Sequence, residues 1–350
     1  MQLIHGGDWA GYEREYGAMP LDFSASISPL GLPEGVRQAA AEALTLADRY
    51  PDPLCRTLRH ALAQRYGVGA ERIVCGNGAA DLIYRLVLAK HPCKALITAP
   101  TFSEYERALE TVNCETIHFY LREVNCFDVT PEILALITPE LDMLVLCEPN
   151  NPTGRRTEPE LLRRILRACA EQGTLVMVDE CFADFLDKPS EYTLVSELDR
   201  YPNLVILKAF TKWFAMAGLR LGYALCGSKT VAEALQRCGQ PWPVSTPAQA
   251  AGLAALGERD YDDRLHCLMQ EQRPRLKTAL AELGCKVVPG EANYLLFYHE
   301  DELLGRKLRE RGILLRDCGN YKGLGPGWYR TAVRTAEENG MLLKTLREVL

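Results

Sequence analysis

Short apolar runs alternate with longer segments of helical period over most of this chain, and this alternation constrains the fold more than any other feature. The predicted strands are Ala95–Pro100, Met143–Glu148, Thr174–Asp179, Leu204–Leu207 and Gly222–Cys226. A period of about 3.6 residues predicts helices over Ala79–Lys90, Glu104–Val112, Glu158–Gln172 and Thr230–Cys238. Because continuously apolar strands must be buried on both faces, we expect an α/β fold with a mostly parallel sheet covered by helices. Ligands of such sheets bind beyond the carboxyl ends of the strands.

The pattern changes after about residue 260, where a compact α+β unit is expected. Its predicted elements are Asp262–Leu283, Lys286–Val288, Tyr294–Tyr298, Asp301–Arg311, Ile313–Arg316 and Trp328–Val333. The first 35 or so residues read as irregular and rich in Gly and Pro, followed by a helix over Pro33–Leu46. We therefore expect an N-terminal arm that joins the small domain (1–40), a large domain (41–260) and a C-terminal small domain (261–350).

Composition limits the classes of function. The 350 residues carry a formal net charge of −6, which argues against a nucleic-acid partner. Thirteen cysteines include no C-x-x-C pair, so no metal site is expected. No apolar stretch reaches the roughly 20 residues of a membrane span, and the first residues do not resemble a signal peptide. The sequence predicts a cytoplasmic protein that does not enter membranes.

Two turns after predicted strands could hold a ligand. Gly76–Ala80 leads straight into a helix, and free N–H groups at a helix start bind phosphate. A tight turn with a capped helix would give the same residues. Asn150–Gly154 (NNPTG) is a strong turn signal and, by itself, a modest functional one.

Two charged residues also stand at strand ends. Asp179 closes a buried run and needs a partner, which could be a cationic ring nitrogen, a helix start or an arginine. Lys212 lies among aromatic and small residues, where desolvation would make its amine nucleophilic, although most lysines are solvated surface charges. Arg220 follows eight residues later and suits a phosphate. Together with the two turns, these groups make pyridoxal 5′-phosphate (PLP) a plausible cofactor.

The order of the motifs is recognisable. GNGAAD, PTFSEY, PNNPTG, VDE, T-K-x-x-x-x-x-G-L-R-x-G and YRTAVRTAEEN follow one another in a way that resembles the class I/II aminotransferases of PLP fold type I, over nearly the whole chain. The resemblance implies that Lys212 binds the cofactor covalently and that Asp179 keeps its pyridine nitrogen protonated. It also implies that Asn151 donates to the ring oxygen O3′ and that Phe102 stacks on the ring.

The same resemblance implies a phosphate cup, a second subunit and a substrate clamp. The residues that match the cup are Ala79, Ala80, Thr211 and Arg220. Tyr50 matches the tyrosine that reaches the cofactor phosphate of a neighbouring subunit, which implies a homodimer. Arg330 matches the arginine that binds the substrate α-carboxylate. Two positions depart from the usual pattern: Phe182 stands where a tyrosine often binds O3′, and Ala209 stands where Ser or Thr usually adds a hydroxyl.

Within the class, the chain resembles most the threonine-phosphate decarboxylases of cobalamin biosynthesis, which are related to the histidinol-phosphate aminotransferases. The supporting stretches are His5–Asp8, Asp22–Gly31, Arg49–Pro53 and Arg316–Asn320. His5, Ser26, Asn151, Arg330 and Arg334 are then the expected substrate-binding residues. Ser26 and Ser28 stand where that group usually has Asn. A second arginine, Arg334, suits a phosphorylated substrate, although a surface salt bridge would also explain it.

The leading functional prediction is decarboxylation of O-phospho-L-threonine or O-phospho-L-serine to an amino-alcohol phosphate. Transamination of histidinol phosphate or another amino acid is the alternative, because the outcome depends on which Cα bond stands perpendicular to the cofactor ring. A non-catalytic PLP-binding module is a third reading, disfavoured by the acidic chain and by the intact set of chemical residues. The glycine-rich segment 319–327 is expected to form a loop near the substrate, with no role assigned.

Overall fold

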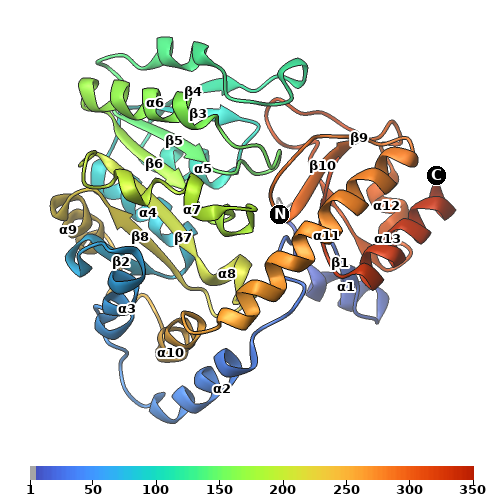
Figure 1. Cartoon of the computed structure of the whole chain (residues 1–350), viewed down its shortest axis with the longest axis horizontal. Coiled ribbons are helices and arrows are strands. Elements are labelled where there is room, and N and C mark those ends of the chain that lie inside the picture. The colour runs from blue at the N-terminus through green and yellow to red at the C-terminus, as the bar shows by residue number, and fades with distance from the viewer. Residues whose placement is uncertain (1–4) are drawn as a thin grey trace.

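A seven-stranded sheet forms the largest part of the computed structural model, which describes residues 5–350 (Figure 1). Its strands, in spatial order, are β2 (Ile73–Gly76), β8 (Gly222–Cys226), β7 (Leu204–Ala209), β6 (Leu175–Asp179), β5 (Met143–Cys147), β3 (Lys94–Ala99) and β4 (Glu115–Tyr120). Strand β8 is antiparallel to both of its neighbours, and every other pair in this sheet is parallel. The expected α/β class with a mostly parallel sheet is confirmed.

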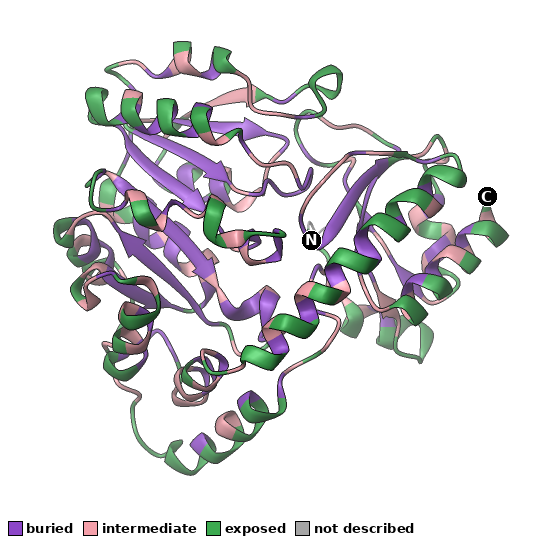
Figure 2. Ribbon diagram, in the orientation of Figure 1, coloured by how far each residue is buried: buried purple, intermediate pink, exposed green. Residues whose placement is uncertain are grey.

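Helices cover both faces of this sheet, as its apolar strands require. Successive side chains of β6 alternate between two apolar clusters. Val176 and Val178 pack with residues of α6 (Pro159–Gln172), α3 (Arg56–Tyr66) and α11 (Arg259–Glu282). Met177 packs on the opposite face with α4 (Gly78–Lys90), α5 (Glu104–Glu110) and α9 (Lys229–Arg237). Figure 2 shows the consequence, with central strands buried between helices whose outer faces are exposed.

Helix α6 illustrates how local sequence sets these elements. Its buried residues, Leu161, Leu162, Ile165, Leu166 and Cys169, recur at helical spacing and form one apolar face. The Glu158 side chain accepts a hydrogen bond from the Leu161 N–H and caps the start of the helix. Gly173 ends it in the left-handed conformation, with φ of 75°.

A second, smaller sheet lies beside the first. Its four antiparallel strands are β12 (Arg316–Asp317), β13 (Trp328–Ala332), β10 (Tyr294–Tyr298) and β9 (Lys286–Val287). Helices α11, α12 (Leu304–Arg309) and α13 (Ala336–Val349) accompany it (Figure 1). Strand β1 (Leu21–Asp22) pairs in parallel with β11 (Ile313–Leu314), so the N-terminal segment joins the C-terminal unit.

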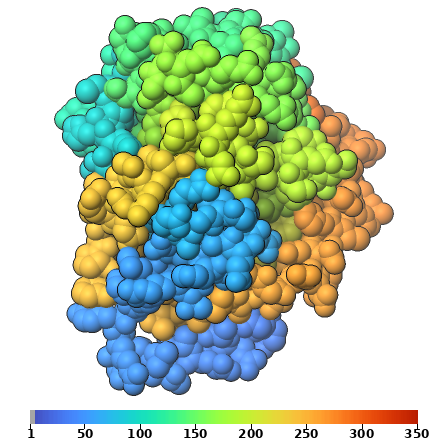
Figure 3. Space-filling model, turned by 60° about the vertical axis from the view of Figure 1, so that its left-hand side comes forward, coloured from blue at the N-terminus to red at the C-terminus, as the bar shows by residue number. Residues whose placement is uncertain are grey.

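Near edge strand β2 of the large sheet, helices from distant parts of the sequence pack together. Helix α10 (Thr246–Ala255) contacts α2 (Glu34–Ala43) and α3. Figure 3 shows this side of the molecule, where blue N-terminal residues lie beside the gold residues that precede α11. The expected domain boundaries at residues 40 and 260 stay a prediction.

The structure corrects the sequence prediction in several places, and it adds helices α3 and α10, for which there was no prediction. The first 35 residues are not all irregular, because Trp9–Tyr16 forms α1 with Asp8 as its N-cap. The predicted strand Ile313–Arg316 is divided into β11 and β12, which belong to different sheets. Edge strand β4 had no prediction, because Thr116 and His118 interrupt its apolar pattern. Within residues 5–350, no helix combines the length and apolar character needed to cross a bilayer.

Candidate active site

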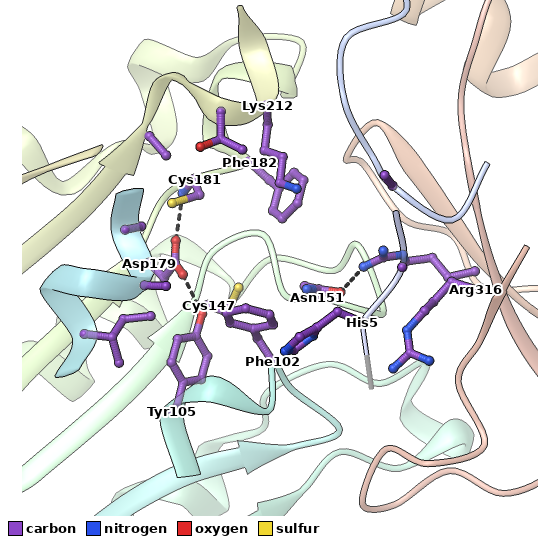
Figure 4. A pocket seen from close by; sticks show the side chains of 18 of the residues that line it. His5, Phe102, Tyr105, Cys147, Asn151, Asp179, Cys181, Phe182, Lys212 and Arg316 are labelled. Carbon is purple, nitrogen blue, oxygen red and sulfur yellow. Dashed lines mark hydrogen bonds between the residues drawn. The ribbon is translucent and has the colours of Figure 1, made fainter. Parts of the chain in front are cut away.

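A cavity of about 290 Å³ opens beyond the carboxyl ends of β3, β5, β6 and β7, the place expected for a ligand in a parallel sheet. Its walls come from the strand ends, from the start of α4, from the N-terminal arm and from the small sheet (Figure 4). Ten of the predicted site residues line it: His5, Ala79, Ala80, Phe102, Asn151, Asp179, Thr211, Lys212, Arg220 and Arg330.

Lys212 has the properties of a nucleophilic amine. It lies in the single turn α8 (Phe210–Trp213), which directly follows β7, and its Nζ lies 5.8 Å from the centre of the Phe182 ring. Burial lowers the pKa of Lys212 to about 8, and the positive charges of Arg330 and Arg220 act in the same direction. An amine with this pKa is partly unprotonated near neutral pH and can attack an aldehyde.

Asp179 is held rigidly at the end of β6. Its side chain is only 6% exposed and accepts hydrogen bonds from the Tyr105 hydroxyl at 2.7 Å and from the Cys181 N–H at 2.9 Å. Both carboxylate oxygens keep further lone pairs for a ligand. A buried carboxylate at the base of the cavity would stabilise a protonated ring nitrogen placed there.

The start of α4 and Arg220 together form a cup that could hold an anion. No side chain caps the N-terminus of this 13-residue helix. Gly78 has φ of 81°, and a Cβ built on it would lie 2.8 Å from Arg220 Nη2. A Cβ on Gly222 would lie 2.5 Å from the Ala79 nitrogen, so two glycines let the helix, β8 and the guanidinium approach one another. Arg220 Nη1 donates to the Ala217 carbonyl at 3.5 Å, and the rest of its guanidinium group lines the cavity, where it can bind a phosphate.

Asn151 and Arg330 form the opposite wall. Arg330, on β13, donates from Nη1 to the Asn151 Oδ1 and from Nη2 to the Ser24 carbonyl at 2.9 Å. This arrangement leaves the Asn151 Nδ2 free to donate to a ligand oxygen. The Arg330 Nε is buried and has no partner among the described residues. The two bonds made by Nη1 and Nη2 hold the guanidinium group at the wall of the cavity, where its charge can attract an anionic ligand.

Three predicted site residues do not line the cavity. Tyr50 is 78% exposed and stacks on Trp242 with ring centres 4.2 Å apart. Arg334 donates to Glu338 at 2.6 Å and to the Asp22 carbonyl at 3.2 Å. The Ser26 hydroxyl is buried without a partner in residues 5–350, and Ser24 lines the cavity in its place. The substrate roles predicted for these residues, and the Tyr50 contact with a second subunit, stay predictions.

Sequence reasoning assigned no role to three residues that the structure brings to the cavity, Tyr105, Arg316 and Tyr321. Tyr105 lies in PTFSEY, and Arg316 lies in the stretch Arg316–Asn320, so both stood within motifs already singled out. Tyr321 lies in the glycine-rich segment 319–327, whose position beside the cavity was expected without a role.

The fold and this site together define a PLP-dependent enzyme architecture, and comparison with known proteins gives the family. The family model for aminotransferase class I and II matches residues 19–346, so the chain belongs to that family. PLP is the cofactor of this family, and the amine, the carboxylate and the anion cup described above fit it.

Relatives within the family carry two different activities in their names. The chain is 38% identical to a threonine-phosphate decarboxylase of Salmonella typhimurium, over 99% of this chain and 96% of that protein. It is 36% identical to a histidinol-phosphate aminotransferase of Desulfitobacterium hafniense, over 93% of this chain and 91% of that protein. The solved histidinol-phosphate aminotransferase of Clostridium acetobutylicum matches with a TM-score of 0.88 and 28% identity, over 94% of this chain and 98% of the other.

Proposed function

We propose that this enzyme decarboxylates an O-phosphorylated L-amino acid, O-phospho-L-threonine or O-phospho-L-serine, and releases an amino-alcohol phosphate. The 38% identity to a threonine-phosphate decarboxylase over nearly the full length of both chains supports this choice.

One observation carries the proposal. Arg316 and Arg330 are directly opposite each other across the β12–β13 ladder, and both line the cavity. They are only 9% and 7% exposed. Two guanidinium groups on one face of this sheet therefore present their donors to the same cavity. A substrate with one carboxylate and one phosphate supplies the two anionic groups that such a pair of guanidinium groups would bind.

The residues on the other walls of the cavity would bind and activate the cofactor in this proposal. Bound PLP supplies an electron sink for the pair released when a Cα bond breaks. Lys212 would hold the cofactor before substrate arrives, and its Nζ would then hold a proton that it can return to the substrate Cα. Asp179 would keep the ring nitrogen protonated, Asn151 Nδ2 would donate to O3′, and the start of α4 with Arg220 would hold the cofactor phosphate.

Tyr50 completes the cup from a second copy of the chain in this proposal. Its exposed ring, stacked on Trp242 and outside the cavity of its own chain, supports a role in a homodimer. The molar mass in solution, measured by light scattering, tests this part separately.

Transamination of the histidinol-phosphate type is the second candidate, favoured by the 36% identical aminotransferase. The same lysine, carboxylate and anion sites would serve it, because the two reactions differ in which Cα bond is broken.

The deciding experiment supplies the PLP-loaded enzyme with O-phospho-L-threonine, then O-phospho-L-serine, and records CO₂ release and the cofactor spectrum. Unphosphorylated L-threonine is the matched control. We expect steady CO₂ release from a phosphorylated substrate with the starting spectrum restored after each turnover. Conversion of the cofactor to its pyridoxamine form without CO₂ would instead establish the aminotransferase.

A further inference from the structure

The first turn of α5 contacts three separate walls of the cavity through three consecutive residues. Tyr105 donates to Asp179, as described above. Its neighbours Glu104 and Glu106 point to two segments that are far away in the sequence, the N-terminal arm and the 319–327 loop. Neither carboxylate has a role in the proposed chemistry.

Glu104 holds the N-terminal arm. Its Oε1 lies 2.7 Å from the His5 Nε2, and its other oxygen accepts from the Tyr84 hydroxyl at 3.0 Å. Although burial opposes ionisation, the hydrogen bonds from His5 and Tyr84 lower the pKa of Glu104. The His5 ring also lies over Phe102, with ring centres 5.6 Å apart. One ionised carboxylate therefore fixes the orientation of a histidine that lines the cavity (Figure 4).

Glu106 holds the loop. It accepts a hydrogen bond from the Lys322 Nζ and lies 3.2 Å from the His118 Nε2. In the loop, Asn320 Oδ1 accepts from Arg316 Nη2 at 2.9 Å, and the Arg316 guanidinium lies 5.1 Å from the centre of the Tyr321 ring. Because Asn320 and Tyr321 immediately precede Lys322 in the chain, the contact that holds Lys322 also restricts where Tyr321 and Arg316 lie in the cavity wall.

The ion pair with Lys322 borders a second cavity of about 140 Å³, which shares Phe102, Arg316 and Tyr321 with the first. The Glu106 carboxylate, which also lines this smaller cavity, offsets the positive charge of Lys322 there. The 319–327 loop also packs closely against the end of β3. A Cβ at Gly323, where φ is 84°, would lie only 3.3 Å from the Ala99 carbonyl, so a glycine permits this close approach.

We propose that Glu104 and Glu106 are positioning residues that fasten the N-terminal arm and the 319–327 loop to α5 and so fix the substrate-side wall of the cavity. Substrate affinity then depends on two contacts outside the reacting centre, Glu104 with His5 and Glu106 with Lys322, while the cofactor side, fixed by Tyr105 and Asp179, is unaffected by them. This inference rests on the proposed function only in taking the cavity as the place where substrate binds.

The test compares Glu104→Gln, Glu106→Gln and Lys322→Met holoenzymes with the parent. All three variants keep the shape of the side chain and remove its charge. Partly exposed ion pairs typically have small effects, so we expect KM to rise about two- to five-fold in each variant, with kcat and the cofactor spectrum unchanged. Amide hydrogen exchange should increase in residues 319–327 for Glu106→Gln and Lys322→Met, and in residues 5–16 for Glu104→Gln.

The chain offers a matched control in Lys286, which pairs with Glu123 between β9 and the turn after β4 and lines neither cavity. Lys286→Met should change neither KM nor exchange in the two segments. Lys322→Arg, which retains the charge, should restore both values. Unchanged KM and unchanged loop exchange in Glu106→Gln and Lys322→Met would overturn the proposal.

The two proposals fail in different ways. If neither phosphorylated amino acid is a substrate, the proposed function is wrong, but hydrogen exchange in the holoenzyme still tests the fastening of the arm and loop. If CO₂ is released with parent kinetics in every variant, the function stands and the positioning role is wrong.

Discussion

The two sides of the cavity are built in different ways. The cofactor side consists of strand ends and the residues that follow them, such as Asp179 after β6 and Lys212 after β7, which are neighbours in one sheet. The substrate side combines His5 from the N-terminal arm with Arg316 and Arg330 from the small sheet, more than 300 residues away along the chain. The cofactor side, built on adjacent strands of one sheet, is suited to hold a cofactor that stays bound. The substrate side, built from distant segments, can differ between relatives with different substrates.

This difference explains why relatives with two activities share one fold. The groups that bind and activate the cofactor are needed for both reactions and depend on the large sheet. In the proposed function, the orientation of the substrate depends on groups that meet only when the small sheet and the N-terminal arm pack against the large sheet. Changes on the two sides should therefore have different kinetic signatures.

The largest effect is expected for Lys212→Ala, which removes the nucleophilic amine. We expect a loss of activity of at least about 10³-fold, by analogy with the loss of other catalytic nucleophiles, measured as CO₂ release and as amino transfer. Lys229→Ala, in an exposed lysine paired with Glu233, is the matched control. A fully active Lys212→Ala enzyme would contradict both candidate functions.

Asp179→Asn should have the next largest effect. The neutral amide would no longer favour a protonated ring nitrogen, as the buried carboxylate does. We therefore expect kcat to fall about 10²- to 10³-fold with little change in KM. Tyr105→Phe removes only one hydrogen bond to this carboxylate and should cost about tenfold or less. Equal effects of the two variants on kcat would show that the charge on Asp179 is not the important property.

The ionisation of Lys212 gives a prediction on pH. Its pKa of about 8 lies below the ordinary lysine value of 10.5, so protonation inactivates the amine only below about pH 8. The rate at which apoprotein combines with PLP should therefore rise about 50-fold from pH 6 to pH 8 and level off above it. Arg220→Gln removes one of the charges that lower this pKa, so its profile should shift to higher pH. A parent profile still rising steeply at pH 10 would show that Lys212 is not desolvated.

A smaller effect, on KM alone, is expected for Arg316→Lys on the substrate side. Lysine retains the charge but not the planar fork of donors that suits a phosphate or carboxylate. We expect KM for the phosphorylated substrate to rise about tenfold, with kcat and the cofactor spectrum nearly unchanged. Arg306→Lys, in an exposed ion pair with Glu310, is the control. A changed cofactor spectrum would mean that the two sides are not independent.

Much of the fold could be predicted from the sequence, since buried parallel strands leave continuous apolar runs. The predicted strand at Gly222–Cys226 matches β8, and those over Met143–Glu148 and Thr174–Asp179 match β5 and β6 to within one residue at each end. Strand β4 and helices α1, α3 and α10 escaped prediction. For β4 and α1 the reason is that edge and surface elements have mixed composition, which gives weak periodicity. Arg316 and Tyr321 escaped assignment because their closeness to the cavity depends on how the small sheet docks.

The sequence by itself determined the family, the α/β architecture and the cofactor class, because strand-end motifs such as VDE and T-K-x-x-x-x-x-G-L-R-x-G combine local backbone geometry with chemistry in a few consecutive residues. Only the tertiary structure decided that Arg316 faces Arg330 across a ladder, and that one turn of α5 contacts three walls of the site. The physical reason is register. Strand pairing and packing between distant segments determine which side chains share a face, and these contacts have no local signal in the chain.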